Sequence, residues 1–186
     1  MEQSEVPLRN RLISELYRRI GETGTLSGAG RSMWFQLRAD GGTCEAEGSL
    51  AYELPDKTLL MYDSDILFTL NIGKRVAVEL EFLSSVSDQF KARSFNVMHV
   101  KKKHGSDVYC VLAYVHMRGI GISTDAAKSY CYPFDEFIGI DFKKPDDLTG
   151  AILNIAGHLE KIIERINVPQ AATCITGNHE TDCRHP

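Results

Sequence analysis

The chain has 186 residues, 43% of them hydrophobic, and a formal net charge of −4. These values are typical of one globular domain with a sizeable core, and they exclude a protein that is basic over its whole surface. No apolar run reaches the length of a membrane-spanning helix, and residues 1–5 are acidic and polar, unlike a signal peptide. The five scattered cysteines favour a reducing compartment, so we predict a cytoplasmic protein with no membrane partner.

The first predicted elements are a helix and two short strands. Apolar side chains recur every four residues over 7–20, which is the spacing of an amphipathic helix. Residues 21–31 predict a flexible connection, because this glycine-rich segment lacks the closing Gly-Lys-Ser/Thr of a phosphate-binding loop. Residues 33–38 predict a strand, and residues 44–52 predict a returning strand that Gly48 interrupts.

Residues 62–82 predict a β-hairpin at the centre of the fold. The first arm begins after Asp65, and Gly73 supplies the positive φ that a tight turn needs. In the second arm the apolar side chains share one face, and Glu79 and Glu81 lie on the other. Because a hairpin brings the start of one arm beside the end of the other, Asp65, Glu79 and Glu81 should converge. Such a cluster is tolerated mainly when a cation or a proton holds it together.

A basic helix and a buried strand follow the hairpin. Residues 84–103 predict the helix, and residues 108–115 are almost continuously apolar, as in a strand that is buried on both faces. Strand, helix and strand together predict a β-α-β crossover with the helix packed on the sheet. The basic residues of the helix are Lys91, Arg93, Lys101, Lys102 and Lys103.

The end of the chain predicts a last short strand at residues 138–142 and a long helix that ends near residue 167. This helix should serve packing or dimerisation. Residues 170–186 lack periodicity and predict a polar tail, so a single domain covers residues 1–169. The spacing of the cysteine and histidine residues in the tail does not favour a zinc site, although four of them lie close together, namely Cys174, His179, Cys183 and His185.

The predicted hairpin offers a metal site. Asp65 and Glu79 become neighbours when the two arms pair, and carboxylates at adjacent strand ends are the hard oxygen ligands that Mg²⁺ takes, with Mn²⁺ as a substitute. Glu79 and Glu81 face the same side of the strand, so Glu81 either binds the metal or acts as a base toward an attacking water. The basic helix supplies cations for a polyanion, which favours a nuclease over a sugar-cleaving carboxylate pair.

These residues resemble the motif of the PD-(D/E)xK nuclease family. That motif is an Asp after a turn, a hairpin, and an acidic-x-Lys triplet, and Asp65 and the triplet that begins at Glu79 match it. The order of elements over residues 7–116 is also similar to the α-β-β-β-α-β core of the family. Two positions depart from the motif, because Ser64 stands where Pro is usual and Glu81 where Lys is usual. The Glu-x-Glu ending is similar to that of type II restriction enzymes of the BamHI type.

The resemblance implies an α/β (α+β) fold with a restriction-endonuclease-like core, in which helices flank a central mixed sheet of about five strands. It implies a Mg²⁺-dependent endonuclease that hydrolyses DNA phosphodiester bonds, of restriction or defence type, acting as a homodimer. Asp65 and Glu79 would then bind the metal. Either Glu81 or Lys91 would fill the lysine role, or the site has decayed. The predicted DNA contacts are Lys91, Arg93, Lys101, Lys102 and Lys103.

Two other functions fit the same sequence, a non-catalytic nucleic-acid-binding domain of this fold and a domain that binds a protein partner. In the second, Asp65 is a turn residue, and Glu79 and Glu81 lie on the solvated face of an edge strand. Asp63 competes with Asp65 for the catalytic position. We prefer Asp65 because the strand of alternating apolar residues begins directly after it.

Overall fold

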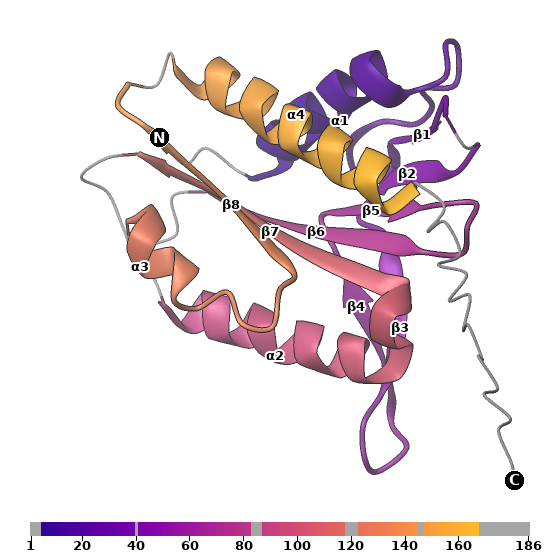
Figure 1. Ribbon diagram of the computed structural model, residues 1–186, viewed down its shortest axis with the longest axis vertical. Coiled ribbons are helices and arrows are strands. Elements are labelled where there is room, and N and C mark those ends of the chain that lie inside the picture. The colour runs from indigo at the N-terminus through magenta and orange to yellow at the C-terminus, as the bar shows by residue number, and fades with distance from the viewer. Residues whose placement is uncertain (1–4, 40, 83–86, 118–122, 145–146, 168–186) are drawn as a thin grey trace, which may run out of the picture.

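The computed structural model describes residues 5–39, 41–82, 87–117, 123–144 and 147–167. They form a six-stranded mixed sheet with helices on both faces, and a separate two-stranded sheet (Figure 1). The predicted fold class, a mixed sheet flanked by helices, is therefore confirmed, with six strands in place of about five.

The main sheet has the strand order β1-β2-β5-β6-β7-β8. Pairing is antiparallel from β1 to β6 and parallel from β6 to β8. Its strands are β1 (Trp34–Gln36), β2 (Thr43–Ala46), β5 (Ile66–Thr69), β6 (Arg75–Phe82), β7 (Val108–Met117) and β8 (Glu136–Phe142). The separate sheet pairs β3 (Ser49–Glu53) with β4 (Leu59–Asp63). The helices are α1 (Glu5–Ile20), α2 (Ser87–His104), α3 (Thr124–Lys128) and α4 (Leu148–Asn167), and the 3₁₀ turns are η1 (Gly30–Ser32) and η2 (Gly105–Asp107).

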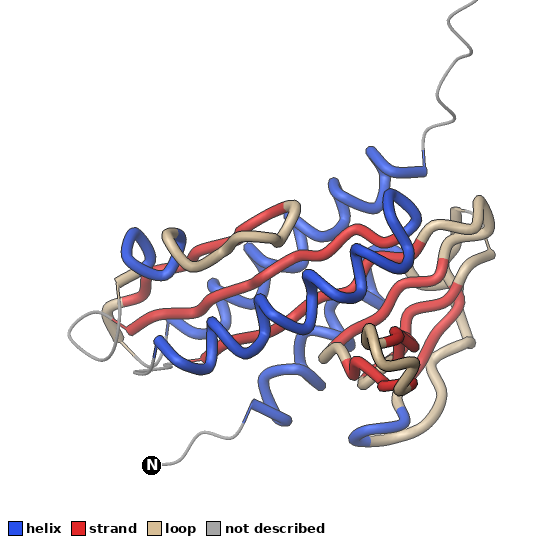
Figure 2. Tube along the Cα trace, turned by 90° about the horizontal axis from the view of Figure 1, so that it is seen from below, coloured by secondary structure: helices blue, strands red, loops and turns tan. Residues whose placement is uncertain are grey.

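The helices form two layers, with α1 and α4 on one face of the sheet and α2 and α3 on the other. Figure 2, which views the molecule from below, shows α2 in front of the strands of the main sheet. β6 contributes to both layers, because Val78 and Leu80 join the core beneath α1 and α4, whereas Ala77 joins the core beneath α2. The alternation predicted for the second hairpin arm is thus confirmed, and β6 is buried on both faces.

The predicted hairpin and crossover are both present. β5 pairs with β6 in a register that sets Ile66 opposite Val78, and β7 pairs with β6 in parallel. Because a parallel connection must return to the start of the first strand, α2 runs back along the sheet. Its last turn therefore lies near the beginning of β6, where His104 Nδ1 is 3.1 Å from Arg75 Nη2.

The single strand predicted over residues 44–52 is wrong, because β2 and β3 belong to different sheets. The chain turns between them at Glu47, whose φ is 51°. Gly48 follows so close to Leu67 that a Cβ atom on the glycine would overlap the leucine side chain. β3 then pairs with β4, and this hairpin packs Leu50 and Tyr52 against the α2 side of the sheet.

The long C-terminal helix has the packing role predicted for it. Ile155 and Leu159 of α4 are buried in the core that α1 shares. The predicted tail, residues 170–186, lies outside the described residues, as does its cluster of cysteine and histidine side chains. In the part of the chain that the structure describes, no helix is long and apolar enough to cross a membrane.

The close contact of Gly48 with Leu67 predicts a destabilising substitution. Gly48→Ala places a methyl group inside the van der Waals radius of Leu67, so we expect the free energy of unfolding to fall by about 1–3 kcal/mol. Gly150→Ala is the matched control, because Gly150 lies in α4 and no atom lies within 4 Å of the place that the added methyl group would take. This control should gain about 0.5–1 kcal/mol. Urea denaturation measures the free energy of unfolding of both variants. Equal values would contradict the close contact of Gly48 with Leu67.

Candidate functional site

The two glutamates of the predicted site lie on the central strand β6, between β5 and β7. Glu79 and Glu81 are each 1% exposed. The alternative prediction, that they lie on the solvated face of an edge strand, is therefore wrong. Carboxylates buried this deeply destabilise a fold unless hydrogen bonds, a counter-charge or a metal stabilises them.

Asp65 lies beside these glutamates because the chain around it is fixed by hydrogen bonds. The hydroxyl and the backbone N–H of Ser64 both donate to the Gly48 carbonyl at 3.0 Å. One residue on, the Asp65 Oδ2 atom accepts a hydrogen bond of 2.8 Å from the backbone N–H of Leu80. Burial raises the pKa of Asp65, while the Leu80 N–H and the charge of Arg93 act in the opposite direction. Asp65 thus reaches the face of β6 that carries the glutamates.

Arg93 of α2 lies among the three carboxylates. Its Nη1 atom forms an ion pair with Glu79 Oε2 and lies 3.4 Å from Asp65 Oδ2. Its Nε atom forms an ion pair with Glu81 Oε1. The convergence of the three acids is thus visible in their contacts with one guanidinium. Among the described residues, no group of three or more His, Cys, Asp or Glu side chains is arranged to hold a metal.

The cluster carries more negative charge than the guanidinium of Arg93 balances. Three carboxylates contact that single cation, and Glu79 Oε1 has no hydrogen-bond partner within the described part of the chain. Arg9 of α1 is the other nearby cation, and its charge lowers the pKa of Asp65 less than that of Arg93 does. Arg9 is itself engaged by Glu47, with 2.5 Å between Nη1 and Oε1. Carboxylate oxygens are the ligands that hard divalent cations such as Mg²⁺ take.

Lys91, which the sequence offered as an alternative to Glu81, lies on a different side of α2 from Arg93. Two residues along an α-helix are turned by about 200° around its axis. Lys91 is exposed and lines a cavity with Tyr130 and Tyr132. Arg93, which the sequence assigned to DNA contacts, is an α2 cation that contacts the carboxylates.

The basic run at the end of α2 is remote from the carboxylates. Eight residues of helix, about 12 Å, separate Arg93 from Lys101. Lys101 forms an ion pair with Asp135, whereas Lys102 and Lys103 are exposed. The cations predicted to lie beside the acidic site thus lie toward the opposite end of the sheet.

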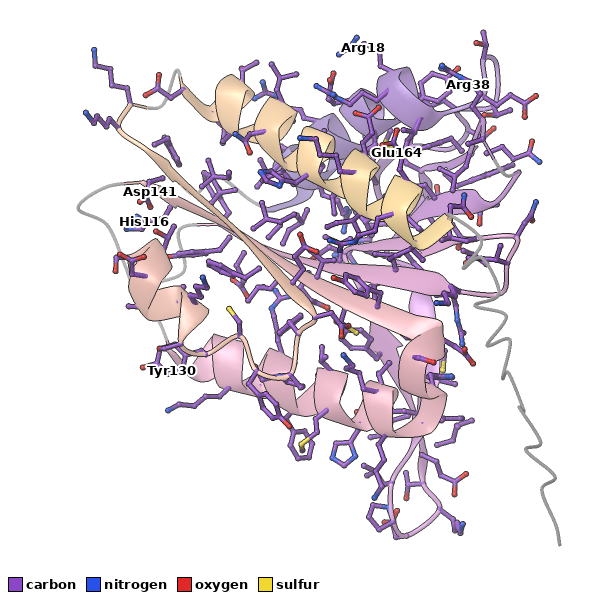
Figure 3. All side chains as sticks on the ribbon, in the orientation of Figure 1. Arg18, Arg38, His116, Tyr130, Asp141 and Glu164 are labelled. Carbon is purple, nitrogen blue, oxygen red and sulfur yellow. The ribbon has the colours of Figure 1, made fainter. Side chains whose placement is uncertain are left out.

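A histidine–carboxylate pair on the same sheet was missed at the sequence level. Figure 3 shows His116 beside Asp141 at the ends of β7 and β8, and 2.9 Å separates Nδ1 from Oδ1. Thr124 donates a hydrogen bond of 3.1 Å to the second oxygen of Asp141. His116 stacks on Tyr114 with 5.9 Å between ring centroids, and Tyr114 is the β7 residue opposite Glu81.

This pair extends the polar face of the sheet beyond the carboxylates. Burial, with a further contribution from the charge of Glu81, raises the pKa of Tyr114 to about 12, so the phenol is neutral near pH 7. The signal in the sequence was the alternation of Tyr114 with His116 at the end of a buried strand.

No protein-family model and no curated protein sequence matches this chain. Its function is therefore inferred from its own residues and their arrangement. The motif around Asp65 and Glu79 remains a resemblance to the PD-(D/E)xK nucleases.

The ion pairs of Arg93 predict how much it contributes to stability. Arg93→Met leaves three carboxylates without their guanidinium, and an uncompensated buried charge costs about 3–5 kcal/mol. Lys102→Met is the matched control on the exposed side of the same helix, and it should change the free energy of unfolding by less than about 0.5 kcal/mol. Urea denaturation followed by circular dichroism compares them. A loss below about 1 kcal/mol for Arg93→Met would show that the carboxylates do not depend on this guanidinium.

Proposed function

We propose that the protein is a Mg²⁺-dependent endonuclease that hydrolyses DNA phosphodiester bonds. The observation that carries the proposal is the convergence of Asp65, Glu79 and Glu81 on one guanidinium, with more negative charge than that cation balances. The order of elements adds support, since a hairpin, a helix and a parallel strand follow one another. The same order is expected from the family that the motif resembles.

The roles of the side chains follow from their positions. Asp65 and Glu79 are the metal ligands in this proposal, with Mn²⁺ as a substitute for Mg²⁺. When bound, the ion supplies charge neutralisation at a phosphate and activation of a water. Glu81, which lies one step further along the same face of β6, holds the attacking water or takes its proton.

DNA is the proposed substrate, and the exposed cations of α2 are its proposed backbone contacts. Lys91, Lys102 and Lys103 are exposed, and lysines that neutralise phosphates release counterions from DNA. Arg93 and Lys101 are engaged by carboxylates and contribute to this surface only if they exchange partners. A homodimer, in which each subunit cuts one strand, and a cytoplasmic location complete the proposal.

A second function is favoured by the same ion pairs. Arg93 neutralises part of the carboxylate cluster without any metal, as expected of a non-catalytic domain of this fold that binds nucleic acid or a protein partner. Such a domain would bind DNA with a steep dependence on salt but would not cleave it, or would bind neither DNA nor metal.

Plasmid cleavage separates these functions. We expect Mg²⁺-dependent nicking by the wild-type protein, and a loss of at least about 100-fold in Asp65→Asn and Glu79→Gln, because each change removes a charged metal ligand. Asp63→Asn is the matched control, because Asp63 is exposed and bonds to Ser49 in the separate sheet. The nuclease proposal fails if purified wild-type protein does not cleave, or if Asp63→Asn loses as much activity as Asp65→Asn.

A second pair of variants decides which residue fills the lysine role. Since Glu81 shares the face of β6 with Glu79 and Lys91 lines a cavity elsewhere, we expect Glu81→Gln to lower the cleavage rate by about 100-fold or more. Lys91→Ala should leave the rate at saturating DNA unchanged within about twofold, because it weakens DNA binding alone. Single-turnover rates at saturating DNA measure the chemical step. The reverse order of effects would assign the role to Lys91.

A further inference from the structure

We propose that Arg93 is an internal cation that competes with the metal for the carboxylate cluster, so that metal binds only when the guanidinium leaves. The inference rests on the proposed function in one respect, since it takes a divalent cation as the ligand of Asp65 and Glu79. It adds a role for a residue that the motif does not include.

The contacts of Arg93 coincide with the proposed metal ligands. A single nitrogen, Nη1, contacts both Glu79 Oε2 and Asp65 Oδ2. These two oxygens come from different segments of the chain, so an ion that bridges them must occupy the space between them. The guanidinium and the metal therefore cannot use these oxygens together.

Of the charged groups in the cluster, Arg93 is the one whose head group can leave. Its side chain is 26% exposed, whereas those of Glu79 and Glu81 are 2% exposed. The two glutamates are fixed on a central strand, and Asp65 is held by the N–H of Leu80. An arginine can keep its aliphatic stem against the protein while its charged end turns to water.

The balance of charge favours replacement of the Arg93 guanidinium by a divalent ion. With Arg93 in place, one guanidinium contacts three carboxylates. A divalent ion brings one more positive charge to the same oxygens and offers Glu79 Oε1, which has no hydrogen-bond partner among the described residues, a ligand position. The released guanidinium can then bind a phosphate in bidentate fashion.

Metal affinity measured without any DNA tests the inference. Mn²⁺ binding to the full chain is followed by electron paramagnetic resonance of the free ion, for the wild type, Arg93→Gln and Arg93→Lys. We expect Arg93→Gln to bind Mn²⁺ at least about tenfold more tightly than the wild type, with Arg93→Lys between them. The matched control is Arg19→Gln, because Arg19 is also 26% exposed and pairs with Glu15 and Glu160 away from the site. It should leave Mn²⁺ affinity unchanged.

A second variant covers the case in which Arg93→Gln does not fold. Adding Glu81→Gln removes one carboxylate together with the guanidinium, and it leaves Asp65 and Glu79 to bind Mn²⁺. This double variant should also bind Mn²⁺ more tightly than the wild type.

In the wild type, guanidinium chloride below denaturing concentration should weaken Mn²⁺ binding more than NaCl of equal ionic strength does. The inference would be overturned if the two salts had equal effects, or if neither Arg93→Gln nor the double variant bound Mn²⁺ more tightly than the wild type. It would also be overturned if the protein did not bind Mn²⁺ at all.

The outcomes distinguish this inference from the proposed nuclease activity. Tighter Mn²⁺ binding by Arg93→Gln, with no DNA cleavage by the wild type, would support the competition and refute the nuclease. Mn²⁺-dependent cleavage by the wild type, with unchanged affinity in Arg93→Gln, would refute the competition and leave the nuclease standing.

Discussion

The burial of Glu79 and Glu81 on β6 is the constraint on which the rest of the site depends. Between them lies Leu80, whose side chain belongs to the core beneath α1 and α4. The glutamates therefore cannot move toward solvent without disturbing the hydrophobic layer on the other face of the strand. Since their desolvation is unfavourable, compensating cations must come to them from the α2 side. Arg93 is the cation that does so.

Because of this constraint, the attachment of α2 to the sheet depends on whether Arg93 is paired with the carboxylates. Among residues 91–104 only Val97 and Val100 are buried, so this part of the helix presents a narrow apolar contact to the sheet. Its polar contacts include the ion pairs of Arg93 and the hydrogen bond, 2.7 Å long, from His104 Nε2 to the Ala51 carbonyl. An element held by few apolar contacts opens locally at low free energy. Release of the Arg93 guanidinium would therefore weaken the polar part of this attachment without disturbing the main core.

Local patterns in the sequence predicted most of the helices and strands, but not which charged side chains would pair. Alternation along β6 predicted which of its side chains share a face, because the period of a strand is fixed. Gly48 marked the break between β2 and β3, but the pairing of β3 with β4 in a separate sheet depends on contacts between distant residues, such as that of Gly48 with Leu67, that no local pattern encodes. Helical spacing did hold the signal for Arg93, because it precedes the buried Val97 and Val100 by four and seven residues and so shares their face. Its charge alone groups it instead with the exposed lysines.

A purely structural role explains this cluster poorly. One carboxylate is enough to neutralise one guanidinium, and buried ion pairs are often replaced by apolar residues without loss of stability. Here three acids converge on one guanidinium, and burial of the additional carboxylates is unfavourable for folding. The same face of the sheet continues past Glu81 to Tyr114 and to the His116–Asp141 pair. Glu81, Tyr114 and the His116–Asp141 pair thus place polar side chains along one face of the central sheet.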